Sequence, residues 1–168
     1  MNDEELLELA ERVGLALKAG GLVLTTAESC TGGWIGEAVT MVAGSSAWYD
    51  RGFITYTNRA KQQMLGVKAS TLMRHGAVSE ETALEMVAGA LAASSAQIAV
   101  AVSGVAGPTG GTADKPVGTV CIGWALAGAA ARAETQHFTG DRAAVRRQSV
   151  IRALTGVLEM TAANSGCG

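Results

Sequence analysis

The segment that most constrains the fold of this chain is Thr-Ala-Glu-Ser-Cys-Thr-Gly-Gly, residues 26–33. It follows Leu22–Leu24, a short branched run flanked by glycines that predicts a buried strand, and it precedes Trp34–Val42, which predicts a helix. Ser29 is therefore expected at a strand-to-helix crossing, where backbone N–H groups and the helix dipole favour an anion or a developing oxyanion. A nucleophile, a phosphate site and simple helix capping by Ser29 and Thr31 all fit this local pattern.

The rest of the chain alternates helical and strand patterns. Helices are predicted at residues 3–19, 59–65, 79–94 and 141–160, and further strands at 52–57, 98–102, 117–126 and 131–138. The last two strands are expected to be antiparallel because the connection around Gly128 is too short for a crossover helix. No repeat or linker divides the chain. We expect one domain over residues 1–163 and a disordered tail over 164–168, in which Cys167 is incidental.

The composition excludes several classes of protein. A formal net charge of -2 and a pI near 5.7 disfavour an extended nucleic-acid-binding surface. Three widely spaced cysteines favour a reducing compartment over a disulfide framework or a zinc site. His75 and His137 add no metal-binding pattern, so neither a metal nor a cofactor is expected. The acidic N-terminus and the lack of a long apolar run predict a soluble protein of the cytoplasm that does not enter a membrane.

A glycine-rich loop, residues 103–112, follows the predicted strand at 98–102. It contains Gly104, Gly107, Gly110 and Gly111 in a spacing that matches neither a nucleotide P-loop nor a dinucleotide-binding fingerprint. Glycines let the backbone approach a ligand closely and present N–H groups to an anion. The loop is therefore a candidate binding element, with a plain turn between strands as the alternative.

Two arginines follow the predicted cap of the last helix, Asp141. Arg142 and Arg146 lie four residues apart near the helix N-terminus, where cations oppose the dipole by about 0.3–1 kcal/mol each and repel one another. An anionic ligand would remove both penalties. The alternative is a pair of solvated surface arginines partly offset by Asp141.

Four separated motifs together identify a family. They are residues 26–33, Tyr56-Thr57-Asn58 with Lys61, Gly104–Pro108 through Lys115–Thr119, and Phe138–Arg142. In this order they strongly resemble the CinA C-terminal domain family, over about residues 5–160. Stand-alone members of that family include nicotinamide-nucleotide amidases.

The resemblance implies a three-layer α/β/α sandwich with a mixed central sheet, and hydrolysis of nicotinamide mononucleotide to nicotinate mononucleotide and ammonia. Ser29 matches the family nucleophile, Lys61 its base and Tyr56 its assisting tyrosine, while Arg142 matches an arginine expected to bind substrate. Lys61 would have to be neutral to act as a base, which requires a lowered pKa. The remaining candidate substrate-binding residues are Thr31, Gly32, Gly33, Gly104, Gly107, Gly110, Gly111 and Arg146, of which the first three lie near backbone N–H groups suited to an oxyanion.

Two other functions fit the same residues. Cys30 adjoins Ser29 and is intrinsically the better nucleophile, so a cysteine-dependent amidase is a rival mechanism. A non-catalytic nucleotide-binding or regulatory module would use the glycines and arginines without turnover. In each case the expected partner is a small pyridine nucleotide, and the apolar, small-residue composition together with the resemblance predicts a homodimer.

Overall fold

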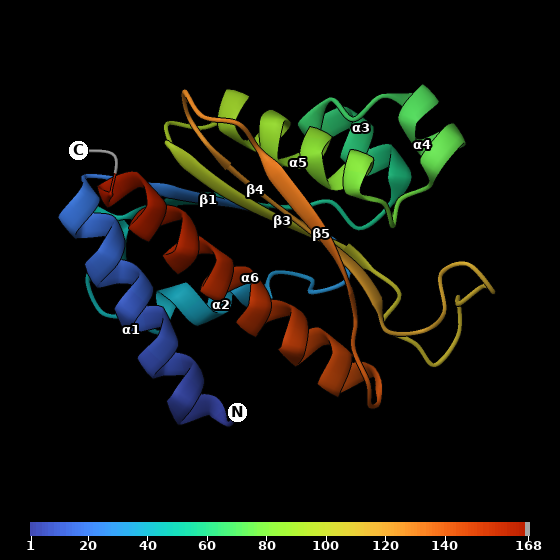
Figure 1. Ribbon diagram of the computed structural model, residues 1–168, viewed down its shortest axis with the longest axis horizontal. Helices are drawn as coiled ribbons and strands as arrows, with labels where there is room; N and C mark the ends of the chain where they lie inside the picture. Colours follow the sequence, from blue (N-terminus) through green and yellow to red (C-terminus); the bar gives the residue numbers. More distant parts are fainter. Residues whose placement is uncertain (167–168) are drawn as a thin grey trace.

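A five-stranded sheet runs through the middle of the computed structural model, which describes residues 1–166 (Figure 1). One face of the sheet is covered by α1 (Asp3–Gly20), α2 (Trp34–Thr40) and α6 (Arg142–Ser165). The opposite face is covered by α5 (Glu80–Ala92), and α3 (Asn58–Leu65) and α4 (Ala69–His75) pack beside α5 on the same side. This arrangement is the predicted three-layer α/β/α sandwich.

The sheet is mixed, with strand order β2-β1-β3-β4-β5. Its members are β1 (Leu24–Glu28), β2 (Tyr49–Ile54), β3 (Ile98–Gly104), β4 (Thr119–Leu126) and β5 (Arg132–His137). Strands β2 and β3 both pair with β1 in parallel, whereas β4 is antiparallel to β3 and to β5, which confirms the predicted antiparallel pair. Because β1, β2 and β3 run in one direction, the residues that follow them meet at one edge of the sheet.

Strand β1 lies later in the chain than predicted. We expected it over Leu22–Leu24, but it runs from Leu24 to Glu28 and all five of its residues are buried. Its threonines are tolerated there because Thr25 Oγ1 donates to the carbonyl of Arg51 at 2.8 Å and Thr26 Oγ1 lies 2.9 Å from the hydroxyl of Tyr49. Polar residues whose hydrogen bonds are satisfied can occupy a central strand, and a hydropathy pattern does not reveal them.

Several other boundaries also differ from the predictions. Strand β2 begins three residues before the predicted 52–57 segment, and Thr57 rather than Asn58 caps α3 by accepting from the N–H of Ala60 at 3.0 Å. Helix α4 was not predicted; none of its residues is buried, so it lacks the apolar stripe that marks a helix. Helix α6 continues to Ser165, so the first two residues of the predicted tail are helical. Residues 167–168, including Cys167, lie outside the described residues.

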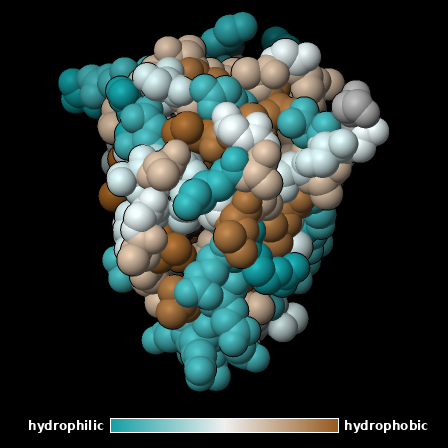
Figure 2. Space-filling view, turned by 90° about the vertical axis from the view of Figure 1, so that its left-hand side faces the viewer, coloured by the Kyte–Doolittle hydropathy of each residue, from teal (hydrophilic) through white to brown (hydrophobic). Residues whose placement is uncertain are grey.

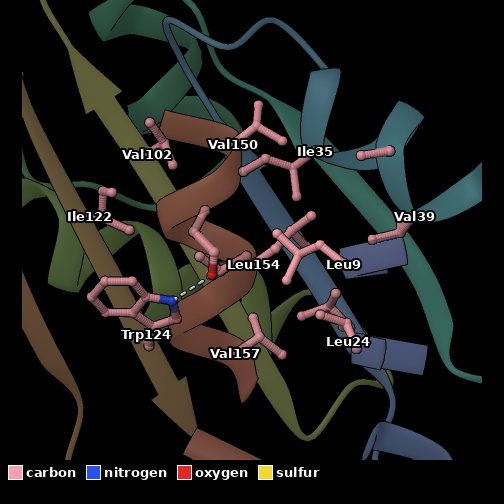
Figure 3. Packing of buried hydrophobic residues seen from close by; sticks show 14 of the residues in the cluster. Leu9, Leu24, Ile35, Val39, Val102, Ile122, Trp124, Val150, Leu154 and Val157 are labelled. Carbon is pink, nitrogen blue, oxygen red and sulfur yellow. Dashed lines mark hydrogen bonds between the residues drawn. The ribbon is translucent and has the colours of Figure 1, made fainter. Parts of the chain in front are cut away.

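The larger hydrophobic cluster lies between the sheet and helices α1, α2 and α6 (Figure 3). Trp124 of β4 is fully buried there, and its indole N–H donates to the carbonyl of Ala153 at 2.9 Å. Gly156 makes room for this ring, because a Cβ at that position would lie 2.1 Å from Trp124 Cε2. The contact fixes α6 against the sheet, and with it the arginines at the start of that helix.

The face seen in Figure 2 carries small hydrophobic patches between hydrophilic residues, and its lower end, where α1 begins, is hydrophilic. The first turn of α1 is acidic and begins with a capping box between Asn2 and Glu5. Within residues 1–166, no helix combines the length and the apolar character needed to span a bilayer.

Candidate active site

The candidate site forms where the parallel strands end. The N–H of Ser29 donates to the carbonyl of Val102 on β3 at 2.9 Å, and the N–H of Thr55 donates to the carbonyl of Glu28 at 2.8 Å. The hydrogen bonding of the sheet therefore continues one residue beyond β1 and β2. This brings Ser29 beside the segment that leads from β2 into α3.

Ser29 begins a tight turn between β1 and α2. The N–H of Gly32 donates to the carbonyl of Ser29 at 3.1 Å, and Gly32 and Gly33 have φ of 61° and 102°, values that side-chain-bearing residues rarely adopt. The two glycines are therefore required by the sharp reversal itself. The predicted strand-to-helix crossing at Ser29 is confirmed.

Glu28, rather than a hydroxyl group, satisfies the start of α2. Its buried carboxylate accepts from the N–H groups of Ile35 at 2.8 Å and Gly36 at 3.1 Å, and from Thr31 Oγ1 at 2.7 Å. Gly33, the residue before the helix, makes no side-chain capping bond. We assigned no role to Glu28 from the sequence, although a carboxylate directly before the turn and the helix N-terminus was the signal that could have identified it.

Lys61 of α3 reaches the hydroxyl of Ser29. Its Nζ lies 2.9 Å from Ser29 Oγ, and it also donates to the carbonyls of Thr55 at 3.0 Å and Tyr56 at 3.2 Å. Lys61 is buried, with an exposed fraction of 1%, and burial lowers its pKa because the charged form is poorly solvated. The family resemblance paired these two side chains as base and nucleophile, and the structure brings them into direct contact.

Cys30 lies beside Ser29, but its thiol is held in the neutral form. Its exposed fraction is 6%, and burial raises its pKa to about 11 despite the opposing effects of Arg146 and Lys61. A thiol needs to ionise before it becomes a good nucleophile or metal ligand. The environment of Cys30 therefore favours a structural residue over a reactive one.

The side chains of Tyr56 and Arg142 form a bridge at the mouth of the site. Arg142 Nη2 donates to the hydroxyl of Tyr56 at 3.2 Å, and Nη1 donates to the carbonyl of Gly107 at 2.8 Å. Tyr56 meets Lys61 through its backbone carbonyl, while its own hydroxyl contacts Arg142. Asp141 caps α6 as predicted, accepting from the N–H of Ala144 at 2.9 Å.

Arg146 lies on the next turn of α6 and points at the turn after Ser29. Its Nε donates to the carbonyl of Cys30 at 3.0 Å, and its Nη2 donates to the carbonyl of Thr31 at 3.1 Å. The guanidinium carbon is 5.4 Å from the centre of the Trp34 ring. Arg142 and Arg146 therefore have different partners, although the sequence pattern treated them as one pair.

Two adjoining cavities share Ala106 and Arg142. The smaller, of about 170 Å³, is lined by Ser29, Cys30, Tyr56, Lys61, Ala77, Val78, Ser103, Gly104, Ala106 and Arg142. The larger, of about 660 Å³, is lined by Ala106, Pro108, Val117, Gly140, Asp141, Arg142, Ala143 and Arg146. One cavity thus presents a hydroxyl and an amine, and the other presents arginines beside apolar atoms.

The glycine-rich loop divides into two parts. Gly104 lines the smaller cavity, and Gly107 has φ of 85° and supplies the carbonyl that holds Arg142. Gly110 and Gly111 line neither cavity, and this part of the loop projects away from the sheet (Figure 1). The structure therefore brings only the beginning of the loop to the candidate site. Among residues 1–166, no group of three or more His, Cys, Asp or Glu side chains is arranged to hold a metal ion.

A buried amine that faces a hydroxyl at the end of a parallel strand is the arrangement of a hydrolase active site. Comparison with known proteins identifies the family. The CinA C-terminal domain family matches residues 6–161, and this chain belongs to that family. It is 55% identical over 154 residues to the nicotinamide-nucleotide amidohydrolase PncC of Escherichia coli strain K12, covering 92% of this chain and 93% of that protein. PncC of Pseudomonas putida is 52% identical over 157 residues, covering 94% and 98%.

Solved structures agree with this membership. The competence/damage inducible protein CihA of Agrobacterium tumefaciens superimposes with a TM-score of 0.90 at 46% identity, covering 95% of this chain and 96% of that one. A CinA superfamily protein of Klebsiella pneumoniae gives a TM-score of 0.91 at 43% identity, covering 96% and 99%. Both likenesses extend over nearly the whole chain.

Proposed function

We propose that this chain is a nicotinamide-nucleotide amidohydrolase, which converts nicotinamide mononucleotide and water to nicotinate mononucleotide and ammonia. The observation that carries the proposal is the 2.9 Å contact between Lys61 Nζ and Ser29 Oγ inside a cavity, in a chain 55% identical to PncC of E. coli. A serine hydroxyl is a weak nucleophile until a base accepts its proton. A buried amine next to that hydroxyl is a suitable base.

The environment of Lys61 supports this role in its neutral form. A neutral amine has two N–H bonds and one lone pair, and the carbonyls of Thr55 and Tyr56 provide two acceptors for those N–H bonds. With both N–H bonds engaged by these carbonyls, the lone pair of the neutral amine is free to accept the proton of Ser29 Oγ, 2.9 Å away. Tyr56 thus assists through its backbone carbonyl, which orients the base.

The reaction then proceeds in two halves. Lys61 accepts the Ser29 proton as Oγ bonds to the carboxamide carbon, and N–H groups of the turn over residues 30–33 stabilise the oxyanion. The carbon–nitrogen bond breaks, and the proton on Lys61 leaves with ammonia, so that an ester on Ser29 remains. Water attacks the ester while Lys61 accepts its proton and returns it to Ser29 Oγ. Nicotinate mononucleotide is released as the carboxylate.

The two cavities suit the two ends of such a substrate. The smaller cavity is proposed to hold the carboxamide beside Ser29, and the larger is proposed to hold the ribose phosphate near Arg142 at the start of α6. A phosphate there would meet a guanidinium and the positive end of a 24-residue helix. Gly104 and Gly107 allow the backbone to approach the nucleotide between the cavities.

Ammonia release tests the proposal directly. The purified chain is incubated with nicotinamide mononucleotide, nicotinamide riboside or nicotinamide, and both ammonia and the carboxylate product are measured. We expect turnover with the mononucleotide and none in Ser29→Ala. Nucleotide binding without ammonia release would instead favour the non-catalytic nucleotide-binding or regulatory module.

We further propose that residues 1–163 act as one domain, located in the cytoplasm and paired as a homodimer. Unfolding followed at the same time by fluorescence and circular dichroism tests the first statement, because one domain gives coincident transitions. Light scattering coupled to size-exclusion chromatography gives the molar mass and tests whether two copies of the chain associate. Fractionation of cells that express the chain tests its location.

A further inference from the structure

Arg146 is held in a way that differs from a free anion-binding arginine. Its Nε and Nη2 lie on one edge of the guanidinium, and they donate to the carbonyls of two consecutive residues, Cys30 and Thr31, at 3.0 and 3.1 Å. The guanidinium carbon also lies over the ring of Trp34, 5.4 Å from its centre. Such a planar fork has a fixed geometry, which an ammonium group does not reproduce.

The peptide between Cys30 and Thr31 connects this contact to the reacting atoms. Among residues 1–166 the only cis peptide bond is Gly107–Pro108, so the Cys30–Thr31 peptide is trans. In a planar trans peptide the carbonyl and the N–H point in opposite directions. Because the Cys30 carbonyl points at Arg146, the N–H of Thr31 points away from α6.

Thr31 lies inside the fold. It has an exposed fraction of 0% and lines neither cavity, so the turn is supported from within the protein. The next N–H in the turn, that of Gly32, donates to the carbonyl of Ser29. The backbone of the turn and the position of Ser29, which begins it, are therefore set together.

Glu28 holds the same turn from the other side. Its carboxylate accepts from Thr31 Oγ1 and from two N–H groups of α2, so the Thr31 side chain and the helix start are fixed together. Arg146 fixes the peptide planes above them. The turn is thus held at both its backbone and its side chain, by residues from β1 and α6.

We propose that Arg146 is a positioning residue that holds the turn after Ser29, and with it the nucleophile and the N–H groups that face the oxyanion formed by its attack. This inference rests on the proposed amidohydrolase function. It distinguishes Arg142, which binds the substrate phosphate, from Arg146, which also lines the larger cavity but acts through the turn.

The test compares Arg146→Met and Arg146→Lys with a matched control, Arg147→Met. Arg147 also lies near Trp34, at 5.0 Å from the ring centre, and pairs with Asp3 at 2.7 Å, but it contacts no carbonyl of the turn. The control therefore removes an arginine from the same ring and helix. Arg146→Lys keeps a charge near Trp34 and serves as the second variant if Arg146→Met does not fold.

We expect Arg146→Met to lower kcat by about 10- to 100-fold, because loss of an oriented oxyanion donor or a small misplacement of reacting groups has effects of this size. The KM should change little, and the loss should be the same for nicotinamide mononucleotide and nicotinamide riboside. Arg146→Lys should recover little activity, since one ammonium group cannot replace the fork. Arg147→Met should retain the wild-type kcat.

Hydrogen exchange supplies a readout that does not depend on turnover. In Arg146→Met, the N–H groups of Gly32 and Trp34 should exchange faster than in the wild type and in Arg147→Met. A raised KM confined to the mononucleotide, with kcat and exchange unchanged, would overturn the inference and make Arg146 a phosphate ligand. If the wild type released no ammonia, the proposed function would fail, while unchanged exchange would still reject the positioning role on its own.

Discussion

Replacing Lys61 by methionine removes the proposed base while keeping a side chain of similar length at a buried position. Lys61 Nζ lies 2.9 Å from Ser29 Oγ, and burial lowers its pKa from the usual lysine value. General bases contribute about 10²- to 10⁴-fold to rate, so kcat/KM of Lys61→Met should fall by that amount. Lys61→Arg should not restore activity, because a guanidinium stays protonated.

The pH dependence of kcat/KM gives the sign of the effect. Only the neutral amine can accept the Ser29 proton, so wild-type activity should rise about tenfold per pH unit below the lowered pKa and level off above it. Lys61→Met should lack this limb. The measurement is kcat/KM of both folded proteins across the pH range. A folded Lys61→Met variant that keeps its activity and the rise of kcat/KM with pH would refute the assignment of Lys61 as the base.

Stability provides a second measurement on the same pair of proteins. Because the folded-state pKa of Lys61 lies below its unfolded value, the unfolded chain binds more protons between those two pKa values. The free energy of unfolding of the wild type, relative to Lys61→Met, should therefore rise with pH in that interval, by at most about 1.4 kcal/mol per pH unit. Urea unfolding at several pH values measures this difference, and a difference that falls with rising pH would contradict the lowered pKa.

Three further predictions concern other parts of the molecule. Ser29→Ala should reduce turnover by at least about 10³-fold, whereas Cys30→Ala should retain most of it, because a thiol with a pKa of about 11 is ionised in roughly one molecule in a thousand near pH 8; steady-state rates reverse the assignment if the loss is confined to Cys30→Ala. Arg142→Ala should lower kcat/KM for nicotinamide mononucleotide by about 10- to 150-fold, the effect of one charge-assisted hydrogen bond, and should affect the riboside much less; equal losses on both substrates would reject phosphate binding. Gly156→Ala should destabilise the fold by about 1–3 kcal/mol, because its Cβ would lie 2.1 Å from the ring of Trp124; an unchanged Tm would show that α6 can move aside.

The long helices were predictable because their apolar residues recur with a clear period, and β4 was predictable because it is a nearly continuous apolar run. Helix α1 was predicted at residues 3–19 and observed at 3–20. Strand β1 was misplaced because its polar members, such as Thr25 and Thr26, are buried with their hydrogen bonds satisfied by side chains and carbonyls of β2. Helix α4 was missed because it buries no residue and so has no apolar stripe.

Less of the candidate site than of the fold could be predicted from the sequence. Local pattern placed Ser29 at a turn, but its contact with Lys61 joins residues 32 positions apart, and the family resemblance was needed to pair them. The contacts of Arg146 with the turn span 115 and 116 positions and carry no local signal. Helix dipole arguments marked Arg142 and Arg146 alike, whereas the packing of α6 gives one a place at the cavity mouth and the other a place against the backbone.

The link between Arg146 and the Ser29 turn has a consequence for the order in which the chain is made. Ser29 and Lys61 leave the ribosome within the first 61 residues, but the guanidinium that holds the carbonyls of Cys30 and Thr31 belongs to the last helix. A nascent chain that ends before α6 contains both reacting side chains and lacks the support of their geometry. The chain should therefore become able to hydrolyse its substrate only late in synthesis, when α6 docks on the sheet and Trp124 packs against Gly156.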